Sequence, residues 1–160
     1  MAKYTWNRGP VPSSLRIKQV YGIVFTDDLR ILLRLEDGVY KLSGGKPEAN
    51  ENYEQTLRRE YIEELNVELD HCFYLGYLLV EEGHDKYAQV RMIATITNIN
   101  KNHVDPDTGK QYGRLLVNAY DAKHYLRYRD KAGNTMLDDA INAAKSKYAF
   151  SKIEQKAESV

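Results

Sequence analysis

Three glutamates near residue 60 have a spacing that is suited to binding a metal ion. They are Glu60, Glu63 and Glu64, in the segment LRREYIEELNV (57–67). On a helix, residues at i, i+3 and i+4 share one face, so we expect the three carboxylates to lie close together. Such neighbours raise one another's pKa, and a hard divalent cation relieves their repulsion because it prefers oxygen ligands. The spacing therefore indicates a site for Mg²⁺ or a similar ion.

A simpler explanation of the same acids is a solvated helix face. Surface helices carry many charges, and Arg59 with Glu63 has the i,i+4 spacing of an ion pair, although Arg before Glu is the weaker order. From the three acids alone, the solvated face is the better explanation. Gly44 and Gly45 lie just upstream, where the missing Cβ lets the backbone come close to a ligand. The whole stretch, rather than the acids alone, favours a site.

Local signals predict the helix that must position these acids. Asn52 with Gln55 three residues later resembles a capping box, which predicts a helix start after a loop at 44–50. We expect the helix to end at about Leu65, because Asn66 tolerates the left-handed backbone common just past a helix end. The residues that can anchor this helix to a sheet are Leu57, Tyr61 and Leu65.

Alternating apolar residues predict a sheet around this helix. The expected strands are 19–25, 29–36, 39–43, 71–82, 86–99 and 115–120, with a hairpin turn at Asp27-Asp28 and a polar loop at 100–113. A second helix is predicted at 135–148, with Thr135 and Asp138 at its start. This order is not a regular β-α-β alternation, so the expected fold class is α+β, a mixed sheet flanked by helices in an α/β/α sandwich.

Length and composition favour one globular domain. The chain has 160 residues, of which 42% are hydrophobic, and it balances 23 basic against 23 acidic side chains. This balance argues against a nucleic-acid-binding surface and against attraction to an anionic membrane. We expect a single domain over 1–160, with an irregular lead-in at 1–16, where Pro10 and Pro12 discourage regular structure, and a polar tail at 150–160.

The sequence also predicts a soluble cytoplasmic protein. Cys72 is the only cysteine, so no intrachain disulfide is possible, and no Cys/His spacing resembles a zinc site. The N-terminus lacks the apolar core of a signal peptide, and no apolar run approaches transmembrane length.

The segment from Gly45 to Val67 resembles the signature of the Nudix hydrolases. That signature is G, five residues, E, seven residues, then R-E-U-x-E-E-x-G-U, where U is a bulky apolar residue. Asn66 replaces the second glycine, and Tyr61 is an unusual choice for an aliphatic position. Upstream, LSGGKPE is similar to the usual LPGGxxE, with Ser43 in place of proline. The matching residues are Gly45, Glu51, Arg59, Glu60, Tyr61, Glu63, Glu64 and Val67.

The resemblance implies a reaction and a ligand set. Nudix hydrolases use Mg²⁺ or Mn²⁺ to cleave a pyrophosphate link in a nucleoside diphosphate joined to another group. By resemblance, Glu60 and Glu64 are the main metal ligands, and Glu63 is a further ligand or the base that deprotonates water. The carbonyl at the Gly44 position often completes the coordination.

The resemblance also suggests supporting roles for neighbouring residues. Arg59 would orient the catalytic carboxylates, and Glu51, with Gly45, would be mainly structural. For contacts to substrate phosphates we expect Arg34, on the strand leading to the motif, and Lys46, directly after the glycines.

The general base varies among Nudix proteins and can come from outside the signature. Glu82, Asp105 and Asp107 are candidates in this sequence, although each is more simply explained as an ordinary polar loop residue.

Three functions compete at this point. The first is a metal-dependent Nudix enzyme acting on a small-molecule nucleotide, and the second is a non-catalytic Nudix-fold module that senses a nucleotide. A structural protein with an acidic helix ranks last. Retention of Glu60, Glu63 and Glu64 favours the enzyme. Substrate identity and oligomeric state stay open, although homodimers are common among similar proteins.

Overall fold

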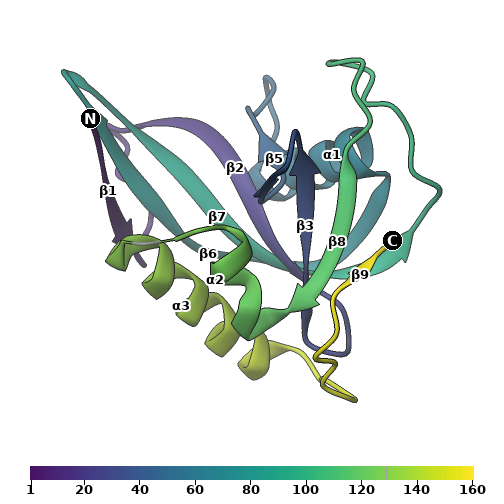
Figure 1. The fold of residues 1–160 in the computed structure, drawn as a ribbon. Helices are drawn as coiled ribbons and strands as arrows, with labels where there is room; N and C mark the ends of the chain where they lie inside the picture. The colour runs from purple at the N-terminus through teal and green to yellow at the C-terminus, as the bar shows by residue number, and fades with distance from the viewer. Residues whose placement is uncertain (129) are drawn as a thin grey trace.

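A computed structural model describes residues 1–128 and 130–160, and within them nine strands form one mixed sheet (Figure 1). The strands are β1 (Ala2–Asn7), β2 (Arg16–Phe25), β3 (Arg30–Glu36), β4 (Val39–Lys41), β5 (Gly44–Gly45), β6 (Val67–Glu82), β7 (Asp85–Ile99), β8 (Gly113–Asn118) and β9 (Glu158–Ser159). The helices are α1 (Tyr53–Leu65), the 3-10 turn η1 (Ala119–Asp121), α2 (Ala122–Tyr125) and α3 (Lys131–Lys147). The main strand order is β1-β6-β7-β2-β3-β8-β9.

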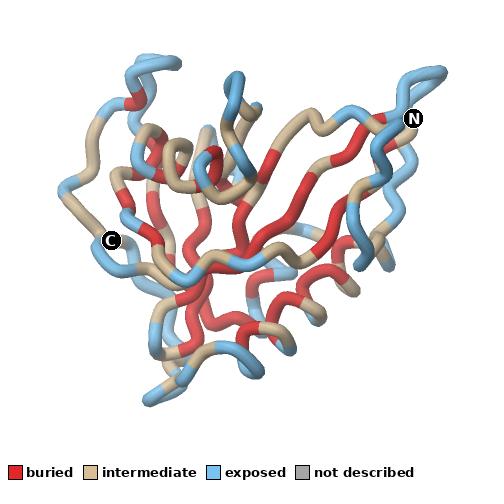
Figure 2. The backbone as a smooth tube through the Cα atoms, turned by 180° about the vertical axis from the view of Figure 1, so that it is seen from behind, coloured by how far each residue is buried: buried red, intermediate tan, exposed pale blue. Residues whose placement is uncertain are grey.

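Helices cover both faces of this sheet, and each face has its own hydrophobic core. The first core joins α1 to the sheet through Leu57, Tyr61 and Leu65, and the second joins α3 through Met136, Leu137, Ala140 and Ile141. Figure 2 shows the buried residues concentrated along the strands between these two layers. The expected α+β class with an α/β/α arrangement is therefore observed.

Strand β7 shows how the sequence pattern divides the two cores. Ala88, Val90, Met92 and Ala94 all lie in the α1 core, whereas Ile93 lies in the α3 core. The alternation predicted for this strand is therefore confirmed.

The sheet opens between β2 and β3, and this opening matters for the site. The two strands pair only at Phe25 and Ile31, next to the predicted turn at Asp27-Asp28. Further along, β2 pairs instead with β5, where Val20 lies opposite Gly45. On its other side β2 pairs with β7, which runs parallel to it. The glycine pair thus becomes a short strand inside the sheet, where a loop was expected at 44–50.

The N-terminal segment corrects the expected irregular lead-in at 1–16. Residues 2–7 form β1, which pairs antiparallel with β6 from Ala2 opposite Glu82 to Asn7 opposite Tyr77. The indole N–H of Trp6 donates to Asp139 of α3 at 2.7 Å and fixes the strand against that helix. Pro10 and Pro12 lie beyond β1, in the irregular connection to β2.

The C-terminal part differs from expectation in three places. Helix α3 begins one turn earlier than predicted, with Asp130 rather than Thr135 as its cap; the Asp130 carboxylate accepts the Gly133 N–H at 2.9 Å. The short helix α2 was not predicted. The polar tail at 150–160 ends in β9, which pairs with β8 through Ser159 opposite Leu115.

No helix among the described residues combines the length and apolar character needed to cross a membrane.

Candidate active site

Helix α1 begins and ends at the residues that the sequence predicts. The Asn52 side chain accepts the Gln55 N–H at 2.8 Å, and the Gln55 side chain accepts the Asn52 N–H at 2.9 Å, which completes a capping box. At the other end Asn66 has φ 52° and ψ 48°, in the left-handed region. Asparagine therefore ends the helix in the backbone conformation that glycine usually supplies.

The aromatic side chain of Tyr61 fits because a glycine lies opposite it. Tyr61 is fully buried, and its hydroxyl donates to the Gly22 carbonyl at 3.1 Å. A Cβ added at Gly22 would lie 2.9 Å from a Leu57 methyl and 3.1 Å from the Tyr61 ring. A glycine inside an apolar strand often marks such a close approach, so Gly22 was the sequence signal for this contact.

Arg59 connects the start of α1 with the acidic residues. Its Nε and Nη2 donate to the Glu51 carboxylate at 2.7 and 3.0 Å, and Nη2 also donates to the Lys46 carbonyl at 3.0 Å. Its Nη1 donates to Glu60 at 2.9 Å and to Glu63 at 3.2 Å. The paired Arg59 guanidinium lowers the pKa of Glu51 to about 2.

Glu60 and Glu63 therefore converge on one positively charged nitrogen. Burial raises the pKa of both carboxyls above the ordinary value of 4.5, and the negative charge of Asp107 adds to the increase, while Arg59 opposes it. Two acids that are costly to ionise, facing one cation, form a place where a further positive charge would be stabilised.

Glu64 occupies a different environment on the same helix. Its side chain is 5% exposed, forms an ion pair with Arg34 and accepts the Gly44 N–H at 3.2 Å. Arg34 is held in turn against the Tyr112 ring, with its guanidinium carbon 4.8 Å from the ring centroid. The Tyr112 contact was not predicted, because it depends on where the 100–113 loop returns to the sheet.

The glycines of β5 are required by this packing. A side chain at Gly45 would collide with the Glu60 carboxylate, and one at Gly44, with φ +152°, would collide with the Val20 carbonyl. The backbone at this point thus runs directly beside the carboxylates of Glu60 and Glu64.

A cavity of about 460 Å³ brings several predicted residues together. Lys46, Arg59, Glu60 and Asp107 all line it. Asp105 is 3% exposed, and its carboxylate accepts the Asp107 N–H at 2.8 Å, so it shapes the loop that carries Asp107.

Glu82, the third candidate for the general base, does not line this cavity, so the structure does not bring it together with Glu60 and Asp107. It lies at the β6–β7 hairpin, opposite Ala2 of β1 and Asp85 of β7. Figure 1 shows this hairpin at the end of the sheet away from α1. The sequence shows only that Glu82 ends an apolar strand. It does not show at which end of the sheet that strand finishes.

The acids do not form the expected three-carboxylate cluster. Among the described residues, no three His, Cys, Asp or Glu side chains are arranged to hold a metal ion. The reason is that Arg34 binds Glu64, while Arg59 lies between Glu60 and Glu63. The donors nevertheless fit Mg²⁺ or Mn²⁺ chemically, because carboxylate and backbone carbonyl oxygens are the ligands that these ions prefer.

Known structures share this fold, whereas sequence comparisons find no relative. The sequence matches no protein-family model and no curated protein. A mutant of the Bacillus subtilis pyrophosphohydrolase BsRppH is similar with a TM-score of 0.69 and 22% identity, over 88% of this chain and 90% of that one. The MutT protein of Bacillus halodurans gives 0.60 and 18%, over 77% and 80%. The Caenorhabditis elegans Ap4A hydrolase gives 0.54 and 15%, over 78% and 96%.

At these identities the likeness is one of fold. It confirms the expected Nudix-like mixed sheet flanked by helices.

Proposed function

We propose that this chain is a Nudix-type enzyme that uses Mg²⁺ or Mn²⁺ to hydrolyse a pyrophosphate link in a small nucleotide. The observation that carries the proposal is the geometry of α1. Helix α1 brings the Glu60 and Glu63 carboxylates to one nitrogen of Arg59, and it places the Glu64 carboxylate against the Gly44 N–H. Similar folds in a pyrophosphohydrolase and an Ap4A hydrolase support the reaction class.

The acidic residues would divide the work between binding the ion and moving a proton. Glu60, Glu64 and the Gly44 carbonyl would hold the divalent ion, with Glu63 either a further ligand or the base; the ion, when bound, neutralises phosphate charge and lowers the pKa of water. Glu63 is our candidate for the base, because burial raises its pKa toward the range in which a carboxylate accepts a proton efficiently. Asp107 is the alternative base, since it lines the same cavity as Glu60.

The basic residues would position the substrate and the acids. Arg59 fixes the Glu60 and Glu63 carboxylates through hydrogen bonds from one nitrogen. Lys46 lines the cavity beside Glu60 and would contact a phosphate there. Arg34 would do the same from its position next to Glu64, and phosphoryl transfer depends mainly on such positioning and charge stabilisation.

The decisive experiment is a hydrolysis screen. The purified protein is tested against nucleoside triphosphates, sugar nucleotides, dinucleoside polyphosphates and ADP-ribose, with Mg²⁺ or Mn²⁺ and with a chelator. We expect turnover of at least one compound, abolished by the chelator. Glu64→Gln should lower kcat/KM by about 100-fold or more, since even residues that only support metal ligands contribute about 10- to 100-fold.

The matched control is Glu54→Gln, which removes a carboxylate from the same helix. Glu54 lies away from the acid cluster, where it pairs with Arg58 at 3.6 Å. We expect its activity to equal that of the unchanged protein. Equal losses in Glu54→Gln and Glu64→Gln would show that the effect is one of helix charge and not of a site.

A non-catalytic nucleotide-binding module is the second candidate. It is favoured by one observation, that Arg34 and Arg59 already neutralise the carboxylates without a metal ion. In that case no compound is hydrolysed, and Glu64→Gln binds nucleotides as tightly as the unchanged protein does.

A further inference from the structure

A second cavity, of about 500 Å³, lies where the sheet opens between β2 and β3. Three cations line it, Arg34, Lys41 and Arg91, and none of the described lining residues is acidic. Arg34 and Lys41 pair with Glu36, outside the lining, at 3.7 and 3.5 Å, whereas Arg91 has no ion pair among the described residues. Arg34 also binds Glu64, so this cavity adjoins the candidate active site. A lining of this kind attracts anions.

Arg91 is the unusual member of this lining. The residue is 5% exposed, and its Nε and Nη1 have no hydrogen-bond partner among the described residues. The guanidinium carbon lies 4.8 Å from the centroid of the Tyr21 ring, which also lines the cavity. Burial lowers the pKa of Arg91, while hydrogen bonding to the Tyr128 side chain and the nearby Tyr21 hydroxyl act in the opposite direction. A buried charge without a carboxylate partner is destabilising unless a ligand supplies one.

Another buried arginine shows that the fold can satisfy such a group when it is structural. Arg114 is 7% exposed, and its Nη1 donates to the carbonyls of Leu65 at 2.8 Å and Asn100 at 2.7 Å. Its Nε donates to the Val160 carbonyl at 3.0 Å. Arg91 lacks an equivalent set of acceptors, which separates it from a purely structural arginine.

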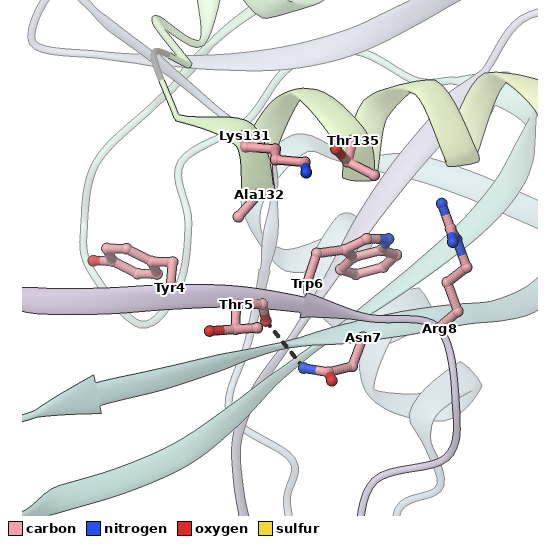
Figure 3. A pocket seen from close by; sticks show the side chains of 8 residues that line it. All are labelled: Tyr4, Thr5, Trp6, Asn7, Arg8, Lys131, Ala132 and Thr135. Atoms are coloured by element: carbon pink, nitrogen blue, oxygen red, sulfur yellow. Dashed lines mark hydrogen bonds between the residues drawn. The ribbon is translucent and has the colours of Figure 1, made fainter.

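The neighbouring cavities do not supply the missing anion. A cavity of about 270 Å³ shares Arg91 and Tyr128 and also contains Asp130, but among the described residues that carboxylate forms no ion pair with Arg91 and instead accepts the Gly133 N–H at the start of α3. A third cavity, of about 470 Å³, lies beyond Tyr4 between β1 and the start of α3 (Figure 3). Its Arg8 is already paired with Asp139.

We propose that the cavity between β2 and β3 binds a phosphoryl group of the nucleotide, with Arg91 as its buried anchor. The identity of the ligand as a nucleotide rests on the proposed function, whereas the anion site itself does not. A planar guanidinium forms strong paired hydrogen bonds to phosphate. Lys41, which is half exposed beside Glu36, is a second cation within reach of a ligand in this cavity. The ligand would thus extend from the acidic helix into this cavity through Arg34.

The test measures binding of inorganic pyrophosphate by calorimetry in buffer containing a chelator. Without divalent ions the acidic residues repel the probe, so that binding reports the basic cavity.

Arg91→Met should weaken binding by about tenfold or more, the size expected for hydrogen bonds to a charged group. Because an unpaired buried charge is removed, the melting temperature of the ligand-free variant should be unchanged or higher. Arg91→Lys, which keeps the charge but loses the planar fork, should give an intermediate affinity and serves if Arg91→Met does not fold.

Arg16→Met is the matched control. Arg16 also lies over a tyrosine ring, Tyr87, but it has its own carboxylate partner, Asp85, at 3.0 Å. This variant should bind pyrophosphate as the unchanged protein does. Malonate, a dicarboxylate of similar size, should bind more weakly than pyrophosphate.

Three results would overturn the proposal: no pyrophosphate binding by the unchanged protein, equal binding by Arg91→Met, or malonate binding as tightly as pyrophosphate. Its failure is distinct from failure of the proposed function. Chelator-resistant binding that depends on Arg91, together with no turnover of any nucleotide, would refute the enzyme and leave the anion site standing. Turnover with undiminished binding by Arg91→Met would do the reverse.

Discussion

Individual arginines set the state of the acidic residues in this protein. The sequence predicts that the acids share one helix face, because their spacing along a helix is a local property. It does not predict that Arg34 crosses from β3 to bind Glu64, since that contact depends on how β3 lies beside α1. Arg91 was missed for a related reason: in an alternating strand, an arginine is normally expected to face solvent. Arg91 is buried because helices cover both faces of the sheet, and the strand pattern alone does not reveal that second layer.

Arg34→Gln should destabilise the protein and make its stability depend on metal. The change leaves the Glu64 side chain, 5% exposed, without its cation, and breaking a buried ion pair costs about 3–5 kcal/mol. Added Mg²⁺ should recover part of this loss by replacing the guanidinium. Urea unfolding with Mg²⁺ and with a chelator measures both effects. If Mg²⁺ leaves the midpoint of the variant unchanged, Glu64 is not a metal ligand.

The ion pair between Glu51 and Arg59 should contribute stability in a defined pH range. The folded-state pKa of Glu51 is about 2, below its ordinary value of 4.5, so the contribution is present above about pH 4.5 and is lost as pH falls toward 2. Glu51→Gln should therefore be less stable than the unchanged protein near neutral pH. The difference between the two free energies of unfolding should shrink in acid.

Denaturant titrations at several pH values measure this difference. A gap between Glu51→Gln and the unchanged protein that stays constant down to about pH 2 would contradict the assigned pKa.

At the scale of elements, local sequence signals predicted most of the secondary structure. The capping box at Asn52, the helix stop at Asn66 and the alternation of β7 are written in neighbouring residues, and all three are observed. The missed elements depend on distant partners. β1 exists because it pairs with β6, and the β5 strand exists because β2 leaves β3 and pairs with the glycines instead.

The end of α1 offers a test of why asparagine occupies position 66. Asn66→Ala should destabilise the protein by about 1 kcal/mol, because a side chain with a Cβ and no local hydrogen bond is strained at φ 52°. Asn66→Gly should cost less, because both variants lose the hydrogen bond from the Asn66 amide to the Lys101 carbonyl at 2.9 Å but only alanine is strained. Urea unfolding compares the two variants. Equal stability of Asn66→Ala and Asn66→Gly would mean that the left-handed conformation is not required.

The approach of α1 to β2 depends on Gly22. Gly22→Ala should destabilise the protein by about 1–3 kcal/mol, because the new methyl group would lie 2.9 Å from Leu57 and 3.1 Å from Tyr61. Adding Tyr61→Leu should recover part of the loss by making room, so the two changes should not be additive. Additive losses in a double-mutant cycle would refute the contact between these positions.

Across the whole molecule, the two cores place the two candidate sites differently. The acids lie on the face of the sheet that α1 covers. Arg91 lies on the other face of β7, since its neighbours Val90 and Met92 face α1. The opening between β2 and β3 connects the two candidate sites. The α+β class was predictable because it needs only the order of elements. The opening was not, because it depends on the pairing partner of each strand, and a single sequence gives no register between distant strands.

The packing of β1 on α3 should contribute to the stability of the entire sheet edge. Asp139 accepts a hydrogen bond from Trp6 at 2.7 Å and pairs with Arg8. Asp139→Ala should therefore cost about 1.5–3 kcal/mol, the value for a hydrogen bond to a charged group. Chemical denaturation followed by circular dichroism measures the loss. An unchanged midpoint would show that β1 is held by its pairing with β6 alone.

Trp6 also has an optical consequence. It is the only tryptophan in the chain, and its indole lies at the seam between the first strand and the last long helix. Selective excitation of the indole should therefore report this one seam, with emission moving to longer wavelength when water reaches the ring.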